Sequence, residues 1–399
     1  MPSRLVVFNT LTQRKEPFSS LKRGKVGMFV CGPTVQDYMH MGHARTYVFY
    51  DVVARYLTYL GYEVKFILNI TDTDERITHE ARRRGTAPLS LAREYSKYFI
   101  EDMTKLKAGS VCRFEPVSTH VDEMIVQISR LIEKGHAYVT GGWVYFDIST
   151  FPQFGKLSHQ SRRELSLRPL ELSISKKNPL DFALWRPETL IEGKWDSPWG
   201  RGSPGWHIQD LAVTGSLLGP QYDLHGGAYE LIYPHHEAEI AEAESLSGLT
   251  PFVKYWVHTS LVNMRGKKMS KSTGNVLTVR DAFLTYSADQ LRMFLLGSHY
   301  RKDMDLKGID VSARTYARLK GIAEKALRAT RLEPGKSDAV MLRRFLDAIN
   351  DDFNTPVALG ILRECLESLQ DAGSGPSVGG RLVSIRTASK ILGVDFGLG

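Results

Sequence analysis

Two histidines, His40 and His43, stand three residues apart in the segment HMGH, where they could contact a phosphate. The apolar run at residues 28–31 ends at a Gly-Pro pair, which predicts a buried strand followed by a turn. Apolar residues then recur at helical spacing from Ala44, so the histidines are predicted to lie at a helix N-terminus. Backbone N–H groups and the helix dipole favour an anion there, and two imidazoles add donors. Gly42 lets a nucleotide approach the backbone closely.

A second candidate phosphate site is the segment KKMSKSTGN at residues 267–275. Its lysines could hold a triphosphate as mobile charges, and its hydroxyl groups could donate hydrogen bonds. Taken alone, each of the two motifs is more often a solvated surface turn, because short motifs match by chance. Their occurrence together in one chain favours a nucleotide site.

A third candidate is the segment PHHEAEIA, which begins at Pro234. Proline suits the first turn of a helix, and His235 and Glu239 are four residues apart, so they share a helix face. This spacing can place an imidazole and a carboxylate on one metal ion. It is equally typical of an ordinary polar pair on a solvated face.

The elements that carry these motifs alternate between strand and helix. A β-rich run at residues 62–70 follows the first helix, and a further helix follows the turn at residues 69–72. Strand–helix–strand–helix in this order predicts a parallel sheet of the α/β class, whose ligands bind at the carboxyl ends of the strands. We expect Cys31 and the 69–72 turn at that edge.

Composition limits the class of protein. The chain has 399 residues, a formal net charge of +8 and 42% hydrophobic residues, as expected for a globular protein of two or three domains that could bind an anionic partner. Three scattered cysteines do not make a disulfide framework. The N-terminal residues do not read as a signal peptide, and no window approaches the length of a membrane span. We therefore expect a cytoplasmic protein with no membrane partner.

The motifs together resemble those of the class I aminoacyl-tRNA synthetases, and among them the cysteinyl-tRNA synthetases. The resemblance extends from about residue 5 to residue 392. It rests on these segments: FNTLT, VCGPTV, HMGH, NITDTDERI, KKNPLDFALW, SPWG, PGWHI, HGG, PHHEAEIA and KMSKSTGN.

This family implies a Rossmann-type catalytic domain with a parallel sheet, an inserted connective region and a C-terminal bundle of α-helices. The expected ranges are 1–110 for the first half of the catalytic domain, 111–204 for the insertion and 205–260 for the second half. The KMSKS loop and stem-contact region would occupy 261–310, and the helical domain 311–399. The anticodon-reading module that usually follows is expected to be absent.

The family reaction joins cysteine to ATP, which is bound with magnesium, as an aminoacyl-adenylate, and then transfers the amino acid to the acceptor end of tRNA. By resemblance, four residues act on the phosphates: His40, His43, Lys268 and Lys271. Residues matching the ATP-binding positions are Gly42, Gly226, Gly227, Glu230, Met269, Ser270 and Ser272. Residues matching the amino-acid pocket are Gly32, Thr34, Thr71 and Trp206.

Family members also bind one zinc ion, and the substrate thiolate completes its coordination. The matching positions here are Cys31, Asp210, His235 and Glu239, with Asp210 in place of the family's second cysteine. Aspartate can ligate zinc and keeps the ligand charge, but it makes the site harder.

Other departures lie close to the zinc positions in the sequence. They are Gln36 for a tyrosine, Leu211 for a serine, and Ala228 and Glu230 in the glycine-rich segment. The phosphate motifs are intact, which favours retained ATP chemistry. Three functions stay open. The first is a cysteine–tRNA ligase with an altered metal site. The second is a related ligase for another amino acid or a non-tRNA acceptor. The third is a non-catalytic RNA-binding or regulatory paralogue.

Overall fold

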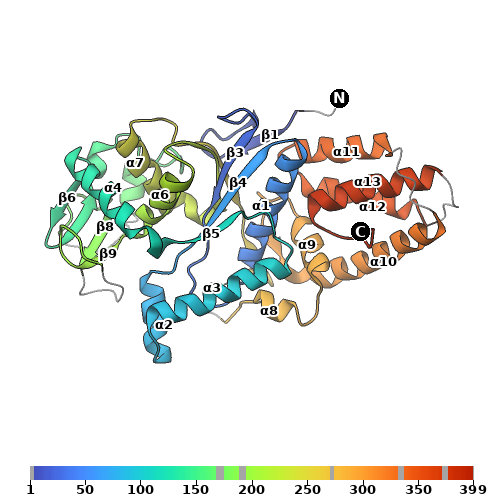
Figure 1. Ribbon diagram of the computed structural model, residues 1–399, viewed down its shortest axis with the longest axis horizontal. Coiled ribbons are helices and arrows are strands. Elements are labelled where there is room, and N and C mark those ends of the chain that lie inside the picture. The colour runs from blue at the N-terminus through green and yellow to red at the C-terminus, as the bar shows by residue number, and fades with distance from the viewer. Residues whose placement is uncertain are drawn as a thin grey trace.

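A parallel sheet lies at the centre of the computed structural model, which describes residues 4–167, 175–187, 195–269, 274–330, 337–370 and 376–398 (Figure 1). Its five strands run in the order β11-β10-β3-β4-β5. Their bounds are β3 (Lys25–Val30), β4 (Glu63–Ile70), β5 (Arg113–Pro116), β10 (Tyr222–Ala228) and β11 (Val253–Thr259). The chain order reverses beside β3, since β4 follows on one side and β10 on the other. Ligands of open α/β sheets bind at such a reversal, beyond the carboxyl ends of the strands.

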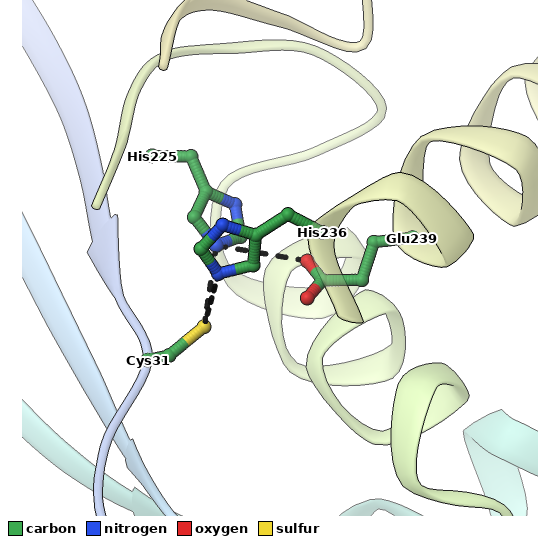
Figure 2. A group of neighbouring side chains, drawn as sticks. All are labelled: Cys31, His225, His236 and Glu239. Atoms are coloured by element: carbon green, nitrogen blue, oxygen red, sulfur yellow. Dashed lines mark hydrogen bonds and ion pairs between the residues drawn. The ribbon is translucent and has the colours of Figure 1, made fainter. Parts of the chain in front are cut away.

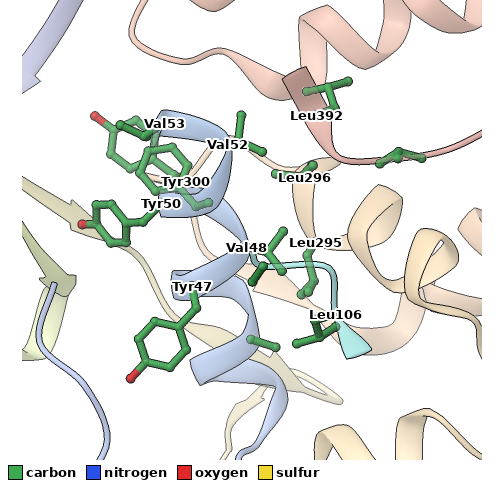
Figure 3. Packing of buried hydrophobic residues seen from close by; sticks show 14 of the residues in the cluster. Tyr47, Val48, Tyr50, Val52, Val53, Leu106, Leu295, Leu296, Tyr300 and Leu392 are labelled. Carbon is green, nitrogen blue, oxygen red and sulfur yellow. The ribbon is translucent and has the colours of Figure 1, made fainter. Parts of the chain in front are cut away.

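Helix α1 (Met41–Tyr59) connects β3 to β4 and is buried along most of its length. It has apolar residues on nearly every face because the sheet covers one side and the C-terminal helices cover the other. In Figure 3, Val48 and Val52 of α1 lie among Leu106, Leu295 and Leu392, which come from distant segments. Helices α2 (Glu75–Arg84) and α3 (Pro88–Lys105) connect β4 to β5. The shared burial of Val48, Val52, Leu106, Leu295 and Leu392 joins α1 to the C-terminal part of the chain.

A smaller antiparallel sheet is formed by the segment between β5 and β10, with strand order β6-β7-β8-β9. Its strands are β6 (Ala137–Thr140), β7 (Trp143–Phe146), β8 (Phe182–Pro187) and β9 (Gly202–Pro204). Gly141 and Gly142 have φ angles of 55° and 82°, the left-handed backbone that a two-residue hairpin turn between β6 and β7 requires. The helices of this segment are α4 (Val121–Glu133) and α5 (Arg162–Ser166). Strand β5 of the parallel sheet lies after residue 110, where we placed the end of the first half.

Helix α6 (Trp206–Leu217) leads the chain from the insertion to β10, and helix α7 (Glu237–Ser247) connects β10 to β11. A hairpin precedes the sheet: β1 (Val6–Asn9) and β2 (Arg14–Pro17). A three-stranded sheet follows it: β12 (Val262–Met264), β13 (Lys267–Lys268) and β14 (Met304–Asp305). The remaining helices are α8 (Val279–Ala282), α9 (Ala288–Leu296), α10 (Ile309–Ala329), α11 (Ala339–Asn350), α12 (Thr355–Glu367) and α13 (Pro376–Leu392).

Parallel sheet, inserted segment and C-terminal helices occur in the predicted order, which confirms the predicted fold class. None of the helices in the described residues has the length and apolar character needed to cross a membrane.

Candidate active site

A cavity of about 340 Å³ opens at the carboxyl ends of β3, β4 and β10. Its wall brings together residues predicted from three separate motifs. The predicted residues on the wall are Cys31, Gly32, Thr34, His40, Gly42, His43, Thr71, Trp206, Asp210, Glu230 and His235. The predicted residues away from the wall are Gly226, Gly227, Glu239 and Met269. Ser270, Lys271 and Ser272 lie outside the described residues, and of Lys268 only the backbone, in β13, is described.

The HMGH segment forms the N-terminus of α1, as predicted. His40 is the N-cap, and its Nδ1 accepts hydrogen bonds from the backbone N–H groups of Gly42 (3.1 Å) and His43 (3.4 Å). The His40 and His43 rings stack with centroids 3.8 Å apart. A Cβ at residue 42 would lie 2.9 Å from His40 Cε1, so a larger residue would displace the His40 ring from this position. Two imidazoles and a helix N-terminus therefore face one cavity.

The two phosphate motifs meet through the backbone. Met41 N donates to Leu277 O (3.0 Å), and Val279 N donates to Met39 O (2.8 Å). Met269 of the second motif packs beside Gly42, since a Cβ at residue 42 would lie 3.6 Å from its Cε. The segments that flank the KMSKS loop are thus fixed directly against the HMGH turn.

Arg280 of α8 strengthens this junction with its side chain. Its guanidinium carbon lies 5.2 Å from the ring centroid of Tyr38 and 4.5 Å from that of Tyr98. Its Nη2 lies 2.8 Å from Glu101 Oε2, and its Nε lies 3.2 Å from Asp102 Oδ1. Tyr38 lies two residues before His40, the first residue of the HMGH segment, whereas Tyr98 and both carboxylates belong to α3. Arg280 therefore connects the end of the KMSKS loop to the start of the HMGH turn.

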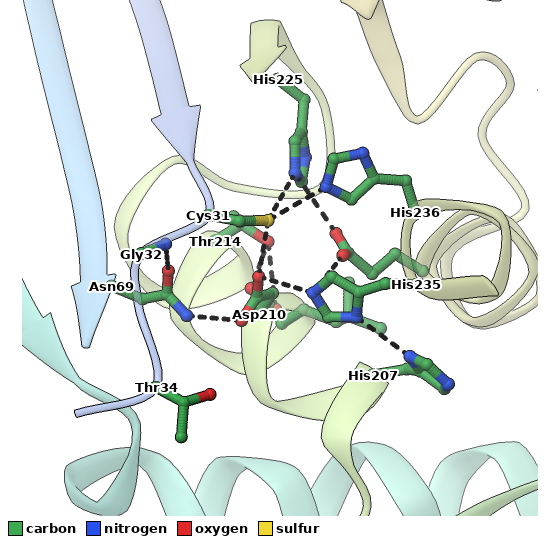
Figure 4. Close-up of polar contacts among 12 residues, drawn as sticks. Cys31, Gly32, Thr34, Asn69, His207, Asp210, Thr214, His225, His235 and His236 are labelled. Carbon is green, nitrogen blue, oxygen red and sulfur yellow. Dashed lines mark hydrogen bonds and ion pairs between the residues drawn. The ribbon is translucent and has the colours of Figure 1, made fainter. Parts of the chain in front are cut away.

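The inner end of the cavity holds a polar cluster around Cys31 (Figure 4). The Cys31 Sγ lies 3.0 Å from Asp210 Oδ2, and His235 Nε2 lies 3.1 Å from the same oxygen. His235 Nε2 is also 3.0 Å from Glu239 Oε1, which is the predicted contact of residues four apart on a helix. The four residues matched to the zinc ligands by resemblance thus lie together, with donor atoms within 4.8 Å of one another. We name them the outer set, because three of them line the cavity.

A second set of possible ligands shares Cys31 and Glu239 with the first (Figure 2). Cys31 Sγ lies 3.3 Å from His225 Nε2 and 3.1 Å from His236 Nε2. We name Cys31, His225, His236 and Glu239 the inner set. Neither His225 nor His236 was assigned a role from the sequence. Two features of the sequence could have pointed to them: the histidine before the Gly226-Gly227 pair and the pair of histidines in PHHEAEIA.

All residues of both sets are buried. Burial shifts the pKa values of Cys31, Glu239 and His236 in the direction that favours their neutral forms. Burial raises the pKa of the Cys31 thiol well above its ordinary value, and the charges of Asp210 and Glu239 raise it further. Burial likewise raises the pKa of Glu239, to which Asp210 and Glu242 add. Burial lowers the pKa of His236, and neighbouring imidazoles lower it further. Without a metal, Cys31, Glu239 and His236 therefore favour their neutral forms.

A divalent cation fits this cluster. Both carboxylate oxygens of Glu239 are buried without a hydrogen-bond partner, as are those of Glu242, within the described part of the chain. The donors are sulfur, imidazole nitrogen and carboxylate oxygen, the ligand types of zinc. An ion would lower the pKa of the thiol and the carboxyl against the effect of burial and would keep the imidazoles neutral, because metal binding displaces the protons of its ligands.

Two predicted ATP-contact positions have packing roles. A Cβ at Gly226 would lie 2.3 Å from Tyr50 Cζ, and one at Gly227 would lie 2.9 Å from His236 Cε1. Arg76, which the sequence analysis did not include in the site, lines the cavity. Its Nη2 donates to Thr34 Oγ1 (2.8 Å), and its guanidinium carbon lies 5.8 Å from the Trp206 ring.

Similarity to known proteins defines the class of protein to which this chain belongs. The model of the class I (C) tRNA synthetase catalytic domain matches residues 17–315. Mycobacterium tuberculosis methionyl-tRNA synthetase, solved with methionyl-adenylate, has the same fold. Its TM-score is 0.67 at 16% identity, over 94% of this chain and 92% of that one. LeuRS from Agrobacterium radiobacter K84, solved in a ternary complex with tRNA, gives 0.70 at 12% identity over 94% and 84%. The fold and the matched domain are those of a class I tRNA synthetase.

Within that class, the chain belongs to the cysteine–tRNA ligase family. The cysteine–tRNA ligase of Thermoplasma acidophilum is 43% identical over 356 residues, which are 87% of this chain and 78% of that relative. The one from Trichlorobacter lovleyi is 40% identical over 415 residues, covering 99% of this chain and 85% of the relative. These matches confirm the family that the sequence motifs indicated.

Proposed function

We propose that this chain activates cysteine with ATP and transfers it to tRNA. The observation that carries the proposal is one cavity in which the N-terminus of α1 and the Cys31 cluster face the same space. A nucleotide phosphate at His40 and His43 and an amino-acid side chain at Cys31, Asp210 and His235 would then be held together. Such positioning supplies much of the rate of a reaction between two substrates.

In the first step, a carboxylate oxygen of the amino acid attacks the α-phosphorus of magnesium-bound ATP. The new P–O bond forms as the bond to the β-phosphate oxygen breaks, and pyrophosphate leaves. His40 and His43 would contact the phosphates with the help of the α1 N-terminus, and Lys268 and Lys271 would stabilise the leaving pyrophosphate. In the second step, a hydroxyl of the terminal tRNA ribose attacks the activated carbonyl, and AMP leaves.

The amino acid would lie between Thr34, Thr71 and Trp206, with its side chain toward the outer set. Gly32 is also part of this wall. Its lack of a side chain is needed there, because a Cβ would lie 1.6 Å from Asn69 O. Bound zinc would supply affinity for sulfur, and Cys31, Asp210, His235 and Glu239 would hold it. Glu230 and the Gly226-Gly227 segment would adjoin the nucleoside. Basic residues of α10 would contact tRNA phosphates.

ATP–pyrophosphate exchange with each amino acid in turn tests this proposal. We expect exchange with cysteine alone. A second candidate, a ligase for another amino acid, is favoured by Asp210, whose Oδ1 accepts a hydrogen bond from Asn69 Nδ2 (2.7 Å) at the cavity wall. Exchange with a different amino acid would establish that candidate. Absence of exchange with every amino acid, with the protein folded, would exclude both and leave the non-catalytic paralogue. Charging of tRNA by the active enzyme tests the acceptor.

Arg280 provides a prediction about positioning in this reaction. Replacing Arg280 with glutamine removes the cation between Tyr38 and Tyr98 and loosens the junction of the two phosphate motifs. We expect kcat of exchange to fall by about 10- to 100-fold, since a misplacement of about 1 Å can have that effect. KM for cysteine should change little, because Arg280 does not line the cavity.

Arg84 gives a matched control for Arg280. Its guanidinium lies 5.1 Å from the Tyr95 ring and pairs with Glu80, so it makes the same kinds of contact on α2, away from the KMSKS segments. Arg84→Gln should leave kcat within about twofold of the parent. Equal losses in both variants would show that Arg280 acts through general stability.

A further inference from the structure

We propose that the inner set of Cys31, His225, His236 and Glu239 is a second metal position, and that it holds the ion when the cavity contains no amino acid. The inference concerns metal binding by the free protein, and it goes beyond the proposed reaction. The two sets share Cys31 and Glu239, so one ion occupies one set at a time.

Donor chemistry favours the inner set for zinc. It offers one sulfur, two imidazole nitrogens and one carboxylate, whereas the outer set offers one sulfur, one nitrogen and two carboxylates. Thiolate and imidazole ligands suit zinc, and additional oxygen ligands suit harder ions. Asp210 stands where a thiolate would have made the outer set softer. The substitution therefore shifts the balance toward the two histidines.

The histidines of the inner set are already oriented for coordination. His225 Nδ1 lies 2.7 Å from the Tyr222 hydroxyl, and His236 Nδ1 lies 2.8 Å from His258 Nε2. Both rings therefore present Nε2 to Cys31 (Figure 2). A metal-binding histidine is typically held in this way by a partner on its other ring nitrogen. Tetrahedral zinc would separate sulfur and nitrogen ligands by about 3.5 Å, close to the observed 3.3 and 3.1 Å.

Asp210 already has partners without a metal. Its Oδ1 accepts from Asn69 Nδ2 at 2.7 Å, and its Oδ2 lies close to both Cys31 and His235 (Figure 4). Neither oxygen of Glu239, which both sets share, makes a regular hydrogen bond among the described residues, but Oε1 lies 3.0 Å from His235 Nε2 and Oε2 lies 3.6 Å from His225 Nε2. Glu239 therefore faces one histidine of each set and is available to an ion in either set, while Asp210 needs a cation less.

The charges of the ligands and their burial also favour the inner set. In the inner set, the ligand charges of one thiolate and one carboxylate balance a divalent ion, whereas the ligands of the outer set exceed it by one negative charge. His225, His236 and Glu239 are 0% exposed and lie away from the cavity wall. An ion there has four protein ligands and no face open to an amino acid, as in structural zinc sites.

The inner position has a consequence for the reaction. A substrate thiolate can reach an ion beside Cys31, Asp210 and His235, which line the cavity, but not one enclosed by His225 and His236. Recognition through the metal would therefore require the ion to exchange its two inner histidines for Asp210, His235 and the substrate.

Titration of the whole, metal-free chain with Co²⁺, followed by absorption spectroscopy, tests the inner position without using activity. Tyr222→Phe removes only the hydroxyl that orients His225 and keeps the ring, so the fold should persist. We expect the Co²⁺ dissociation constant to rise by about 10- to 100-fold, the usual effect of losing such a partner. The thiolate-to-cobalt absorption band should be kept, because Cys31 remains.

His207→Asn is the matched control for the outer set, because His207 Nδ1 lies 2.9 Å from His235 Nδ1. We expect its Co²⁺ affinity to stay within about threefold of the parent. His225→Asn and His235→Asn repeat the comparison at the ligands themselves, and metal-free thermal unfolding checks each fold. Loss of affinity in the His207 and His235 variants alone would overturn the proposal. The proposal would also be overturned by equal losses of Co²⁺ affinity in the inner-set and outer-set variants, by no loss of affinity in any variant, or by no Co²⁺ binding to the parent protein.

Discussion

Replacing His43 with alanine is expected to lower kcat of ATP–pyrophosphate exchange by about 10²- to 10³-fold, the range found when one preorganised donor to a developing charge is removed. The His43 ring lines the cavity one turn inside α1 and stacks on His40. Its loss removes a donor beside the helix N-terminus, where the phosphates would bind. Unfolding in urea should change by less than about 1 kcal/mol, because the ring is only half-buried.

His40 and His79 provide the comparisons for this prediction. His40→Ala should lower exchange as well, but it also removes the N-cap acceptor for Gly42 and His43, so about 0.5–2 kcal/mol of stability should be lost. His79 is exposed on α2 and should tolerate alanine in both assays. A His43→Ala protein that exchanges at the parental rate would show that His43 does not contact the phosphates in the transition state.

Local sequence patterns were sufficient to place the phosphate half of the site. Alternation of apolar runs with helical spacing predicted β3 and α1, and the helix begins at Met41, inside the HMGH segment. The Gly141-Gly142 pair suits the β6–β7 hairpin because two consecutive residues with positive φ are needed there. These features depend on neighbours in the chain, which is why the sequence predicts them.

The candidate metal ligands could be predicted only through the family resemblance. The resemblance identified the outer set but not the inner set. Cys31, His225 and His236 approach one another through the pairing of β10 with β3 and through the turn before α7, which no local pattern encodes. The contact of the His225 ring to Tyr222 lies within β10, whereas the contact of the His236 ring to His258 involves another strand, β11. A histidine on a buried strand is most often part of a packed core, so its sequence context alone did not identify it as a ligand.

The junction of the two phosphate motifs is a similar case. Arg280 follows the KMSKS loop by a few residues, and its aromatic neighbours Tyr38 and Tyr98 are far away in the sequence. The Tyr38 side chain belongs to the turn before His40, whereas Tyr98 belongs to α3. Their assembly around one cation depends on the packing of α3 against α1, where Phe99 contacts Tyr47, a tertiary arrangement that helical periodicity does not specify.

The largest expected effect on stability is at Arg292 of α9. Arg292 and Asp51 of α1 are both 0% exposed, and Arg292 Nη2 lies 2.7 Å from Asp51 Oδ2. The same guanidinium donates to Leu392 O (2.7 Å) at the end of α13 and to Leu106 O (3.1 Å) after α3. A Cβ at Gly393 would lie 2.2 Å from Nη2, so the chain after α13 is fitted closely around this arginine.

We therefore expect Arg292→Leu to lower the free energy of unfolding by about 3–5 kcal/mol in urea denaturation, the usual result of removing one member of a buried ion pair. Asp51 keeps Arg55, whose Nε lies 2.7 Å from Asp51 Oδ2, but that side chain is 30% exposed and cannot replace a buried cation. The carbonyl groups of Leu106 and Leu392 would also lose a donor. Because Arg292 joins α1, α3 and α13, detachment of the C-terminal helices should accompany the loss.

Two further variants separate the buried charge from the loss of side-chain volume. Asp51→Asn combined with Arg292→Leu should be less destabilising than the sum of the single changes, because it removes the unpaired carboxylate. Arg344→Leu breaks an exposed pair with Glu364, whose side chains are 56% and 64% exposed, and should cost less than about 1 kcal/mol. If the double variant instead shows the full sum, the stabilisation by Arg292 comes from its carbonyl contacts, and the pairing with Asp51 contributes little to holding α13 against α1.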